Sequence, residues 1–137
     1  MTDKAAVVER FASAIGGGDM TAAMALLAPD IVIYHSSRMP YAGIYHGHDG
    51  FLRMLGIIDA FWQTFGSAVP PLVAEIDDAV VVAGRVTGRP RHLATDLTIP
   101  VMERYSVDGG LITRIDPCYA DLDLTPEQLG LHRPTGA

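Results

Sequence analysis

The first half of the chain carries three stretches in which apolar residues recur at the three- and four-residue spacing of an amphipathic helix. The first, residues 7–15, stops at "GGGD", because successive glycines lose too much backbone entropy to stay helical. The second, "MTAAMALLA", follows Asp19, which can cap a helix, and stops before Pro29. The third begins at about Asp49 and extends to the region of Gly66. The pattern therefore predicts three helices.

The other apolar stretches are rich in β-branched and aromatic residues, which is typical of strands. One of them, "IVIYH" at 31–35, lies between the second and third helices. The rest follow the third helix as "LVAEI", "AVVVAGRVTG", "LTIPVMERYSV" and "LITRIDPCY", and the turn Asp108-Gly109-Gly110 joins the last two. This order indicates an α+β fold, in which a cone-shaped, curved, mainly antiparallel sheet wraps around the three N-terminal helices and encloses a cavity. We expect its mouth where residues 31–35 lead into the third helix.

The length of the chain, 137 residues, is typical of a single domain, and 49% hydrophobic residues can supply a core. We expect the core to span about residues 5–122 and the polar, proline-containing end from Asp121 to be loosely held. The stretch "AVVVAGRV" is apolar on both faces, whereas a strand with one solvated face alternates. This favours a homodimer formed through the outer face of the sheet.

The charge of the chain limits its partners. Ten Lys and Arg against sixteen Asp and Glu give a net charge of -6, which argues against nucleic acid and anionic membranes as main partners. Cys118 is the only cysteine, so no internal disulfide can form and a reducing compartment is expected. No apolar stretch has the length of a signal core or a membrane span. We therefore expect a soluble, cytoplasmic protein.

The link "IVIYHSSRMPYAGIYHGHDGF", residues 31–51, holds three histidines and three tyrosines. His46 and His48 form an HxH pair, but zinc and iron sites need three or four convergent ligands, so we expect no metal and no cofactor. His35 follows two isoleucines on one face of a strand and should face the cavity. It could act as a general acid or base, or it could be a histidine at the edge of the core, bonded to a backbone carbonyl.

Glu103 belongs to a strand face that is otherwise apolar apart from the hydroxyl of Tyr105. Burying a carboxylate is costly unless it is paired or protonated, which makes Glu103 a candidate for the site. Alternatively, it forms a salt bridge with Arg85 or Arg114, or a bulge turns it to solvent. If Glu103 lies within hydrogen-bonding reach of His35, its carboxylate should raise the pKa of the imidazole.

Aromatic residues with a polar tip are candidates for the lining of the cavity. Tyr45 would lie at the entrance, and the loop residues His92 and Asp96 could close over the mouth or simply be solvated. The residues that we expect to contact a substrate are Phe11, Tyr41, Trp62, Tyr105 and Tyr119.

Two stretches, "LLAPDIVIYHSSRMPYAGIYHGHDGF" and "ERYSVDGGLITRIDPCYAD", resemble the SnoaL-like polyketide cyclases and the ketosteroid-isomerase-related proteins of the nuclear transport factor 2-like superfamily. The shared features are "APD" before the first strand, a histidine or aspartate at its end, "PYAGIYHG" before the third helix and a C-terminal hairpin. The resemblance covers about residues 5–122. It implies the fold more strongly than the reaction, because this superfamily includes several enzyme classes and non-catalytic binders.

The resemblance places His35 where ketosteroid isomerase has its general-base aspartate. Phe11 takes the place of the isomerase's oxyanion tyrosine and Ile99 lies near that of its protonated aspartate, so both hydrogen-bond donors are missing. What remains implied is a cofactor-independent acid/base enzyme with His35 and Glu103 as catalytic residues. It would be an isomerase, cyclase or dehydratase for a small hydrophobic carbonyl-containing metabolite, polyketide- or terpenoid-like. The alternatives are a non-catalytic small-molecule-binding domain of the same fold and an epoxide hydrolase.

Overall fold

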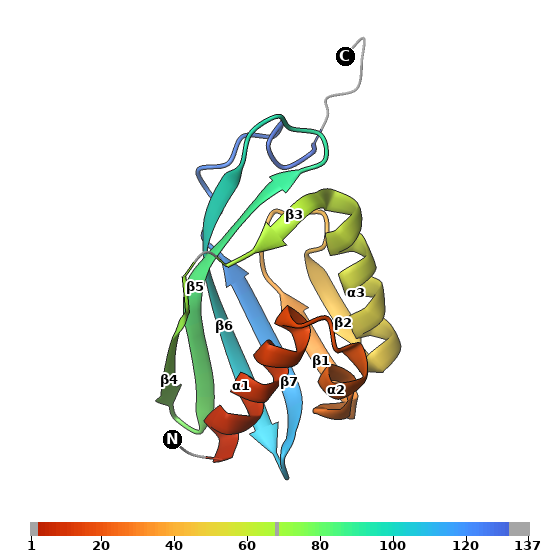
Figure 1. Ribbon diagram of the computed structural model, residues 1–137, viewed down its shortest axis with the longest axis vertical. Helices are drawn as coiled ribbons and strands as arrows, with labels where there is room; N and C mark the ends of the chain where they lie inside the picture. Colours follow the sequence, from red (N-terminus) through yellow and green to blue (C-terminus); the bar gives the residue numbers. More distant parts are fainter. Residues whose placement is uncertain (1–2, 68, 132–137) are drawn as a thin grey trace.

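The structure is a computed structural model that describes residues 3–67 and 69–131. The helices are α1 (Asp3–Gly16), α2 (Met20–Ala25) and α3 (Gly47–Phe61). The strands are β1 (Leu27–His35), β2 (Gly43–His46), β3 (Trp62–Gly66), β4 (Leu72–Ile76), β5 (Ala79–Pro90), β6 (Leu97–Asp108) and β7 (Leu111–Tyr119) (Figure 1). The three helices and the α+β class agree with the prediction from the sequence.

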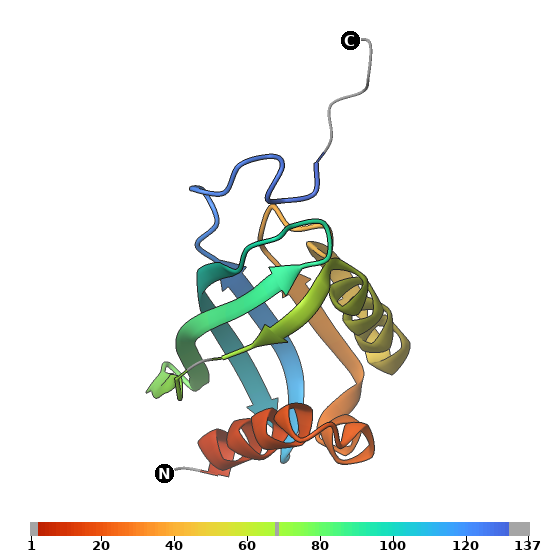
Figure 2. The same cartoon turned by 45° about the horizontal axis from the view of Figure 1, so that its top comes forward.

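The strands form one mixed sheet in the order β2-β1-β7-β6-β5-β3, and β4 also pairs with β5. All neighbours are antiparallel except β1 and β7, which are parallel. Because β3 and β4 pair with different parts of β5, together they form one interrupted edge. The sheet curls strongly, α1 and α2 cross one end of it, and α3 lies along the side formed by β1 and β2 (Figures 1 and 2).

The third helix is shorter than the sequence predicts. It ends at Phe61, and Trp62 is already extended and begins β3. Helical spacing of aromatic residues continues to Phe65, but pairing with β5 determines the backbone here. This pairing depends on Gly88, where a Cβ atom would clash with the Thr64 carbonyl oxygen and come within 3.0 Å of the Trp62 ring. The long-range contact therefore overrides the local pattern.

The inner face of the sheet carries the core. One cluster of buried residues lies under α1 and α3 and includes Phe11, Phe51 and Tyr105. A second lies at the opposite end, around Tyr41 and Trp62. No helix in the described ranges is long and apolar enough to cross a membrane.

The segment after β7 is packed more closely than the sequence suggests for the end beginning at Asp121. Within its described part, residues 121–131, Leu129 is fully buried in the second cluster and Asp121 is also buried. The segment lies over the end of the sheet formed by the β5–β6 connection and the link after β1 (Figures 1 and 2). Residues 132–137 lie outside the described residues.

Candidate functional site

His35 is the last residue of β1, and its side chain points into the interior. Alternation along the strand turns Ile31, Ile33 and His35 inward, and the imidazole is only 5% exposed. Its ring meets Tyr41 and Tyr119 edge to face, with centroids 4.9 and 4.8 Å away. The histidine therefore lies between two aromatic rings at the inner end of the strand.

One ring nitrogen of His35 has a partner and the other does not. Nδ1 lies 3.2 Å from the hydroxyl oxygen of Ser37, which itself accepts the backbone N–H of Met39. Nε2 has no hydrogen-bond partner in the described part of the chain, where every fully buried side-chain nitrogen or oxygen has one. Nε2 therefore keeps some contact with solvent and can meet a ligand.

Burial lowers the pKa of His35 from 6.5 to about 4, although the carboxylate of Asp121 raises it in part. The ring is consequently uncharged at neutral pH. The expected rise in this pKa depended on a hydrogen bond between Glu103 and His35, which the structure does not show, and desolvation outweighs the Asp121 carboxylate. Moreover, the carboxylate whose charge raises the pKa of His35 is that of Asp121, not that of Glu103.

Glu103 faces the same interior from β6, and β7 separates it from β1. Its pairing partner on β7 is Pro117, whose carbonyl oxygen accepts the N–H of Ser36, next to His35. With two strand spacings between them, the backbones of Glu103 and His35 are about 10 Å apart. The two residues thus share one face without a direct hydrogen bond between them in the structure.

The alternatives for Glu103 can now be decided. Its carboxylate accepts the hydroxyl of Tyr105 at 3.2 Å, so a bulge does not turn it to solvent. Arg114 pairs with Asp116 at 2.9 Å instead, and the described residues show no ion pair between Glu103 and Arg85. Desolvation raises the pKa of Glu103, which the Tyr105 hydrogen bond offsets only in part.

A chain of hydrogen bonds connects three of the aromatic residues expected at the site. The indole N–H of Trp62 donates to the Tyr41 hydroxyl at 3.0 Å, and this hydroxyl donates to that of Tyr119 at 3.1 Å. Burial raises the pKa of Tyr41 to about 12 and raises that of Tyr119 further, where the charges of Glu103 and Asp121 also contribute. Both hydroxyls therefore stay protonated and can serve as donors.

Phe11 and Tyr105 lie at the other end of the interior. Their rings are 6.2 Å apart, and Phe11 also packs on Phe51 at 5.9 Å. Thus the structure brings together His35 with Tyr41, Trp62 and Tyr119 at one end. At the other end lie Phe11 and Tyr105, and Glu103, which is hydrogen-bonded to Tyr105, lies across β7 from His35.

The sequence did not reveal two residues beside His35. Asp121 is 4% exposed and accepts the backbone N–H of Arg38 at 2.6 Å. The Arg38 guanidinium donates to the carbonyl oxygens of Asp121, Leu122 and Leu124 at 3.2–3.5 Å. The only local signal was that Asp121 comes two residues after Tyr119 and so continues the same strand alternation.

Two other histidines of the described residues, His48 and His92, each bind a backbone carbonyl. Nε2 of His48 donates to the Leu27 carbonyl at 3.0 Å, and Nε2 of His92 donates to the Glu127 carbonyl at 2.8 Å. His46 is exposed, and Asp96 pairs with Arg89. Tyr45 is buried and donates to the Tyr41 carbonyl. Among the described residues, no three His, Cys, Asp or Glu side chains converge as metal ligands would.

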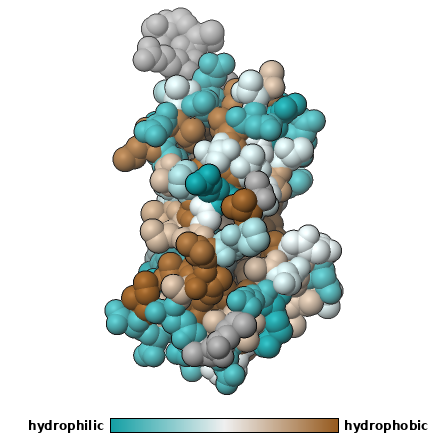
Figure 3. Space-filling view, turned by 60° about the vertical axis from the view of Figure 1, so that its left-hand side comes forward, coloured by the Kyte–Doolittle hydropathy of each residue, from teal (hydrophilic) through white to brown (hydrophobic). Residues whose placement is uncertain are grey.

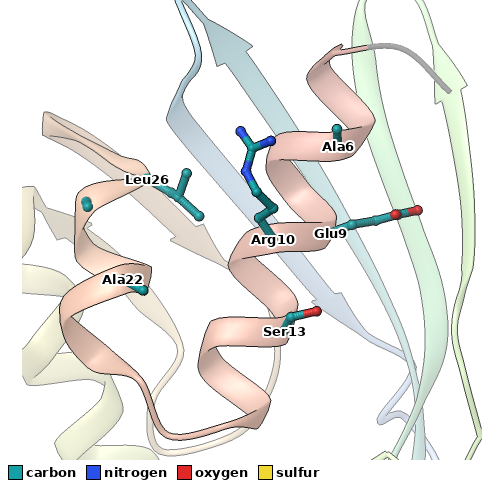
Figure 4. Close-up of a pocket in the computed structure, with 7 residues that line it drawn as sticks. Ala6, Glu9, Arg10, Ser13, Ala22 and Leu26 are labelled. Carbon is teal, nitrogen blue, oxygen red and sulfur yellow. The ribbon is translucent and has the colours of Figure 1, made fainter.

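An open groove of about 680 Å³ lies between α1 and α2, away from His35 (Figure 4). It is lined by Ala6, Glu9, Arg10, Ser13, Ala22, Ala25 and Leu26. By contrast, the interior around His35 is filled by its own aromatic side chains, with Tyr41 at 0% and Trp62 at 2% exposure. A ligand at His35 must therefore displace or rearrange some of these groups.

Comparison with protein families confirms the resemblance seen in the sequence. The model of the SnoaL-like domain matches residues 8–115. Among the curated proteins, none matches the chain.

Solved structures of similar fold cover nearly the whole chain. A nuclear transport factor 2-like protein of unknown function from Burkholderia pseudomallei has a TM-score of 0.81 at 20% identity, over 94% of this chain and 98% of that one. A hypothetical protein from Catenulispora acidiphila with a ketosteroid isomerase-like fold, in complex with trimethylamine, has a TM-score of 0.70 at 19% identity, over 92% and 93%. TerC, co-crystallised with polyporic acid, has a TM-score of 0.76 at 18% identity, over 88% and 94%. At these identities the likeness shows the fold, which is compatible with a ligand-binding or isomerase-type role.

Proposed function

Because this chain belongs to the SnoaL-like domain family, we propose that it is a cofactor-independent acid/base enzyme that moves a proton on a small hydrophobic carbonyl compound. Polyketide- or terpenoid-like metabolites have the required chemistry. The observation that carries the proposal is the neutral imidazole of His35, which lies between Tyr41 and Tyr119 with Nε2 unpartnered. A base with a pKa of about 4 is similar in strength to a carboxylate and remains deprotonated at neutral pH.

His35 is the proposed general base. When Nδ1–H donates to the Ser37 hydroxyl oxygen, the lone pair of Nε2 is available to take a proton from the carbon next to the substrate carbonyl. This forms an imidazolium and an enolate. Return of the proton at another carbon gives an isomer, attack of the enolate on a second carbonyl gives a ring, and loss of a neighbouring hydroxyl as water gives a dehydrated product.

The tyrosine pair is the proposed oxyanion partner. Trp62 and Tyr41 orient successive hydroxyls so that the Tyr119 hydroxyl, which already accepts one hydrogen bond, keeps its own proton for the substrate oxygen. Glu103 is proposed as the second acid, because desolvation raises its pKa and favours the protonated form. Phe11 and Tyr105 would form the apolar wall of the ligand site.

Two other functions remain as alternatives to this proposal. A non-catalytic binding domain would use the same residues to hold a ligand. The dense packing of Tyr41 and Trp62 favours a small ligand over a large one. An epoxide hydrolase is less compatible, because the guanidinium of Arg38 donates to three backbone carbonyls rather than lying between two inward carboxylates.

The test is proton exchange on small ketones. The protein would be incubated in D₂O with a panel of β-dicarbonyl and β,γ-unsaturated ketones, and deuterium incorporation would be followed by mass spectrometry. We expect incorporation on at least one member and a loss of about a hundredfold or more in His35→Ala. Ligand binding without any exchange would support the binding domain, and exchange that His35→Ala leaves unchanged would contradict the proposed base.

We also propose that two copies associate through the outer face of the sheet. Pairing places Leu72, Ala83, Met102 and Cys118 in one row across β4, β5, β6 and β7, with Leu72 78% and Met102 56% exposed. Apolar residues gather on the side of the molecule that carries β4 and β5 (Figure 3). Burial of such a row against its own copy would remove it from water.

Sedimentation at micromolar concentration tests this association. We expect a dimer that Met102→Lys dissociates, whereas Leu52→Lys, exposed on α3, leaves it intact. A monomer at every concentration would contradict the proposal. The free, exposed thiol of Cys118 fits the cytoplasm as the proposed location.

A further inference from the structure

The segment of residues 121–131, here called the closing segment, covers the end of the interior at which His35 lies. It leaves β7 and lies beside the β5–β6 connection and the link after β1 (Figures 1 and 2). Leu129 is fully buried among Tyr41, Phe61, Trp62 and Tyr119, which also surround the candidate site. This side chain therefore separates the aromatic rings of the site from solvent.

The closing segment is attached by few polar contacts. Its own hydrogen bonds are local turns, such as Leu124 N–H to the Asp121 carbonyl and Leu129 N–H to the Thr125 carbonyl. Within the described residues, its hydrogen bonds to the rest of the molecule come from His92, which donates to the Glu127 carbonyl, and from Arg38. The segment can thus leave the surface without breaking any pairing in the sheet.

Arg38 makes the most extensive of these attachments. Its backbone N–H donates to the Asp121 carboxylate at 2.6 Å, and its guanidinium reaches carbonyl oxygens along the segment at 3.2–3.5 Å. Arg38 follows His35 by three residues, so the attachment is adjacent to the proposed base. We call Arg38 and Asp121 the latch.

We propose that the latch of Arg38 and Asp121 holds the closing segment over the interior site and that a ligand enters and leaves when this latch opens. The inference rests on the proposed function for the existence of an interior ligand. At the opposite end, α1 and α2 cross the sheet (Figure 1), and the residues that line the groove between them do not include His35. Opening the segment withdraws Leu129 from the aromatic cluster and so exposes the rings that a ligand must reach.

The latch also links closure to the chemistry at His35. The charged and titratable groups that face or neighbour this ring are Asp121, Arg38, Tyr41, Tyr119 and, across β7, Glu103. Only Asp121 belongs to the closing segment. When the segment is closed, the carboxylate of Asp121 lies close enough to stabilise the imidazolium that forms as His35 takes a proton. Asp121 is therefore a positioning residue.

Hydrogen exchange of individual amides tests the latch without any ligand. In Asp121→Ala, the amides of Leu124, Leu129 and Leu131 should exchange about tenfold faster or more. In Arg38→Met, where the substituted side chain is exposed, the same amides should exchange about threefold faster. Amides within β6 should not change. Arg10→Met on α1 is the matched control and should leave the closing segment unaffected (Figure 4). Faster exchange that extends through β6 would show that the segment is an integral part of the fold, which would overturn the proposal.

Stopped-flow binding of 2-naphthol, a fluorescent aromatic alcohol, tests passage through the latch. Arg38→Met should raise the association and dissociation rate constants together by about threefold, in proportion to the faster opening, with little change in affinity. Unchanged rates in a variant whose closing segment exchanges faster would overturn the proposal. If 2-naphthol binds neither protein, the proposed function loses support, and the exchange result alone decides whether the latch opens.

Discussion

His35, which is buried, and Glu103, which is half-buried, are two titratable groups on one face of one sheet, and desolvation shifts their pKa values in opposite directions. Desolvation lowers the pKa of the imidazole to about 4 and raises that of the carboxyl group. In both cases the uncharged form is favoured, but for His35 this form is a base and for Glu103 it is an acid. The same physical cause therefore supplies both partners of an acid/base pair without an ion pair between them.

The surroundings of these two residues differ in polarity. The His35 end contains Ser37, Asp121 and the hydrogen-bonded chain from Trp62 to Tyr119. Around Glu103, the only hydrogen-bond partner of the carboxyl group among the described residues is Tyr105, next to the phenyl ring of Phe11. A polar substrate atom thus fits the His35 end, whereas the Glu103 end suits an apolar body with one proton acceptor.

The pH dependence of stability should differ in sign between the two residues. The folded-state pKa of His35 lies below its unfolded value of 6.5, so its contribution is fully present above pH 6.5 and is lost as the pH falls towards 4. The loss amounts to about 3 kcal/mol. Glu103 has a raised folded-state pKa, so its contribution is present at low pH and is lost as the pH rises through that value.

Urea denaturation between pH 3 and pH 8 measures how the free energy of unfolding changes with pH for each residue. His35→Gln should remove most of the acid-induced loss, and Glu103→Gln should be at least as stable as the parent at neutral pH. An acid-induced loss that is unchanged in His35→Gln would show that the imidazole is solvated, and the comparison with Glu103 would fail.

Substitution of His35 should reduce the rate of proton exchange more than substitution of Glu103. On a ketone that exchanges its α-proton, His35→Ala should lose about a hundredfold, which corresponds to about 2.7 kcal/mol, and Glu103→Gln about tenfold. Because residues that act as a unit are not additive, the double variant should be no slower than His35→Ala alone. Exchange rates from mass spectrometry decide this. Fully multiplicative losses would mean that Glu103 acts independently of His35.

The sequence predicted this inner face better than it predicted the spacing across it. Strand alternation is local, so the inward direction of His35 and Glu103 followed from their immediate neighbours. That β7 separates them depends on the parallel pairing of β1 with β7, which joins distant parts of the chain. The role of Asp121 is hidden for the same reason, since its partner Arg38 is 83 residues away.

The end of the third helix shows the same limit. The spacing of Phe61 and Phe65 continues the helical pattern, and nothing in the local sequence reveals that Trp62 pairs with Pro90. Local periodicity therefore gave the type of the three helices and of β1, β4, β5, β6 and β7, but it missed β2 and β3, and contacts between strands determined where α3 stops.

Gly88 should be needed for the packing around Trp62, at the end of the interior that holds His35, and not for the packing around Glu103. An added Cβ at Gly88 clashes with the Thr64 carbonyl and presses on the Trp62 ring, which should cost about 2 kcal/mol. Gly56, exposed on α3 with nothing near its Cβ position, is the matched control, and alanine there should stabilise by about 0.5–1 kcal/mol. Chemical denaturation gives both values. Equal effects of the two substitutions would contradict the close approach of β3 to β5.

The smallest expected difference concerns the tyrosine hydroxyls that serve the two ends. Tyr41→Phe removes an acceptor from the Trp62 indole N–H and a donor to Tyr119, and leaves that buried N–H unpaired. Tyr105→Phe removes only the donor to Glu103, whose carboxyl group is then more easily protonated. Since an unpaired buried donor costs more than the loss of an average hydrogen bond, we expect destabilisation of about 2 kcal/mol for Tyr41→Phe and about 1 kcal/mol for Tyr105→Phe. Thermal or urea unfolding of the two variants at neutral pH measures the difference. If Tyr105→Phe were the more damaging, the polar network would be centred on Glu103, and the assignment of the polar end of the site to His35 would have to be reversed.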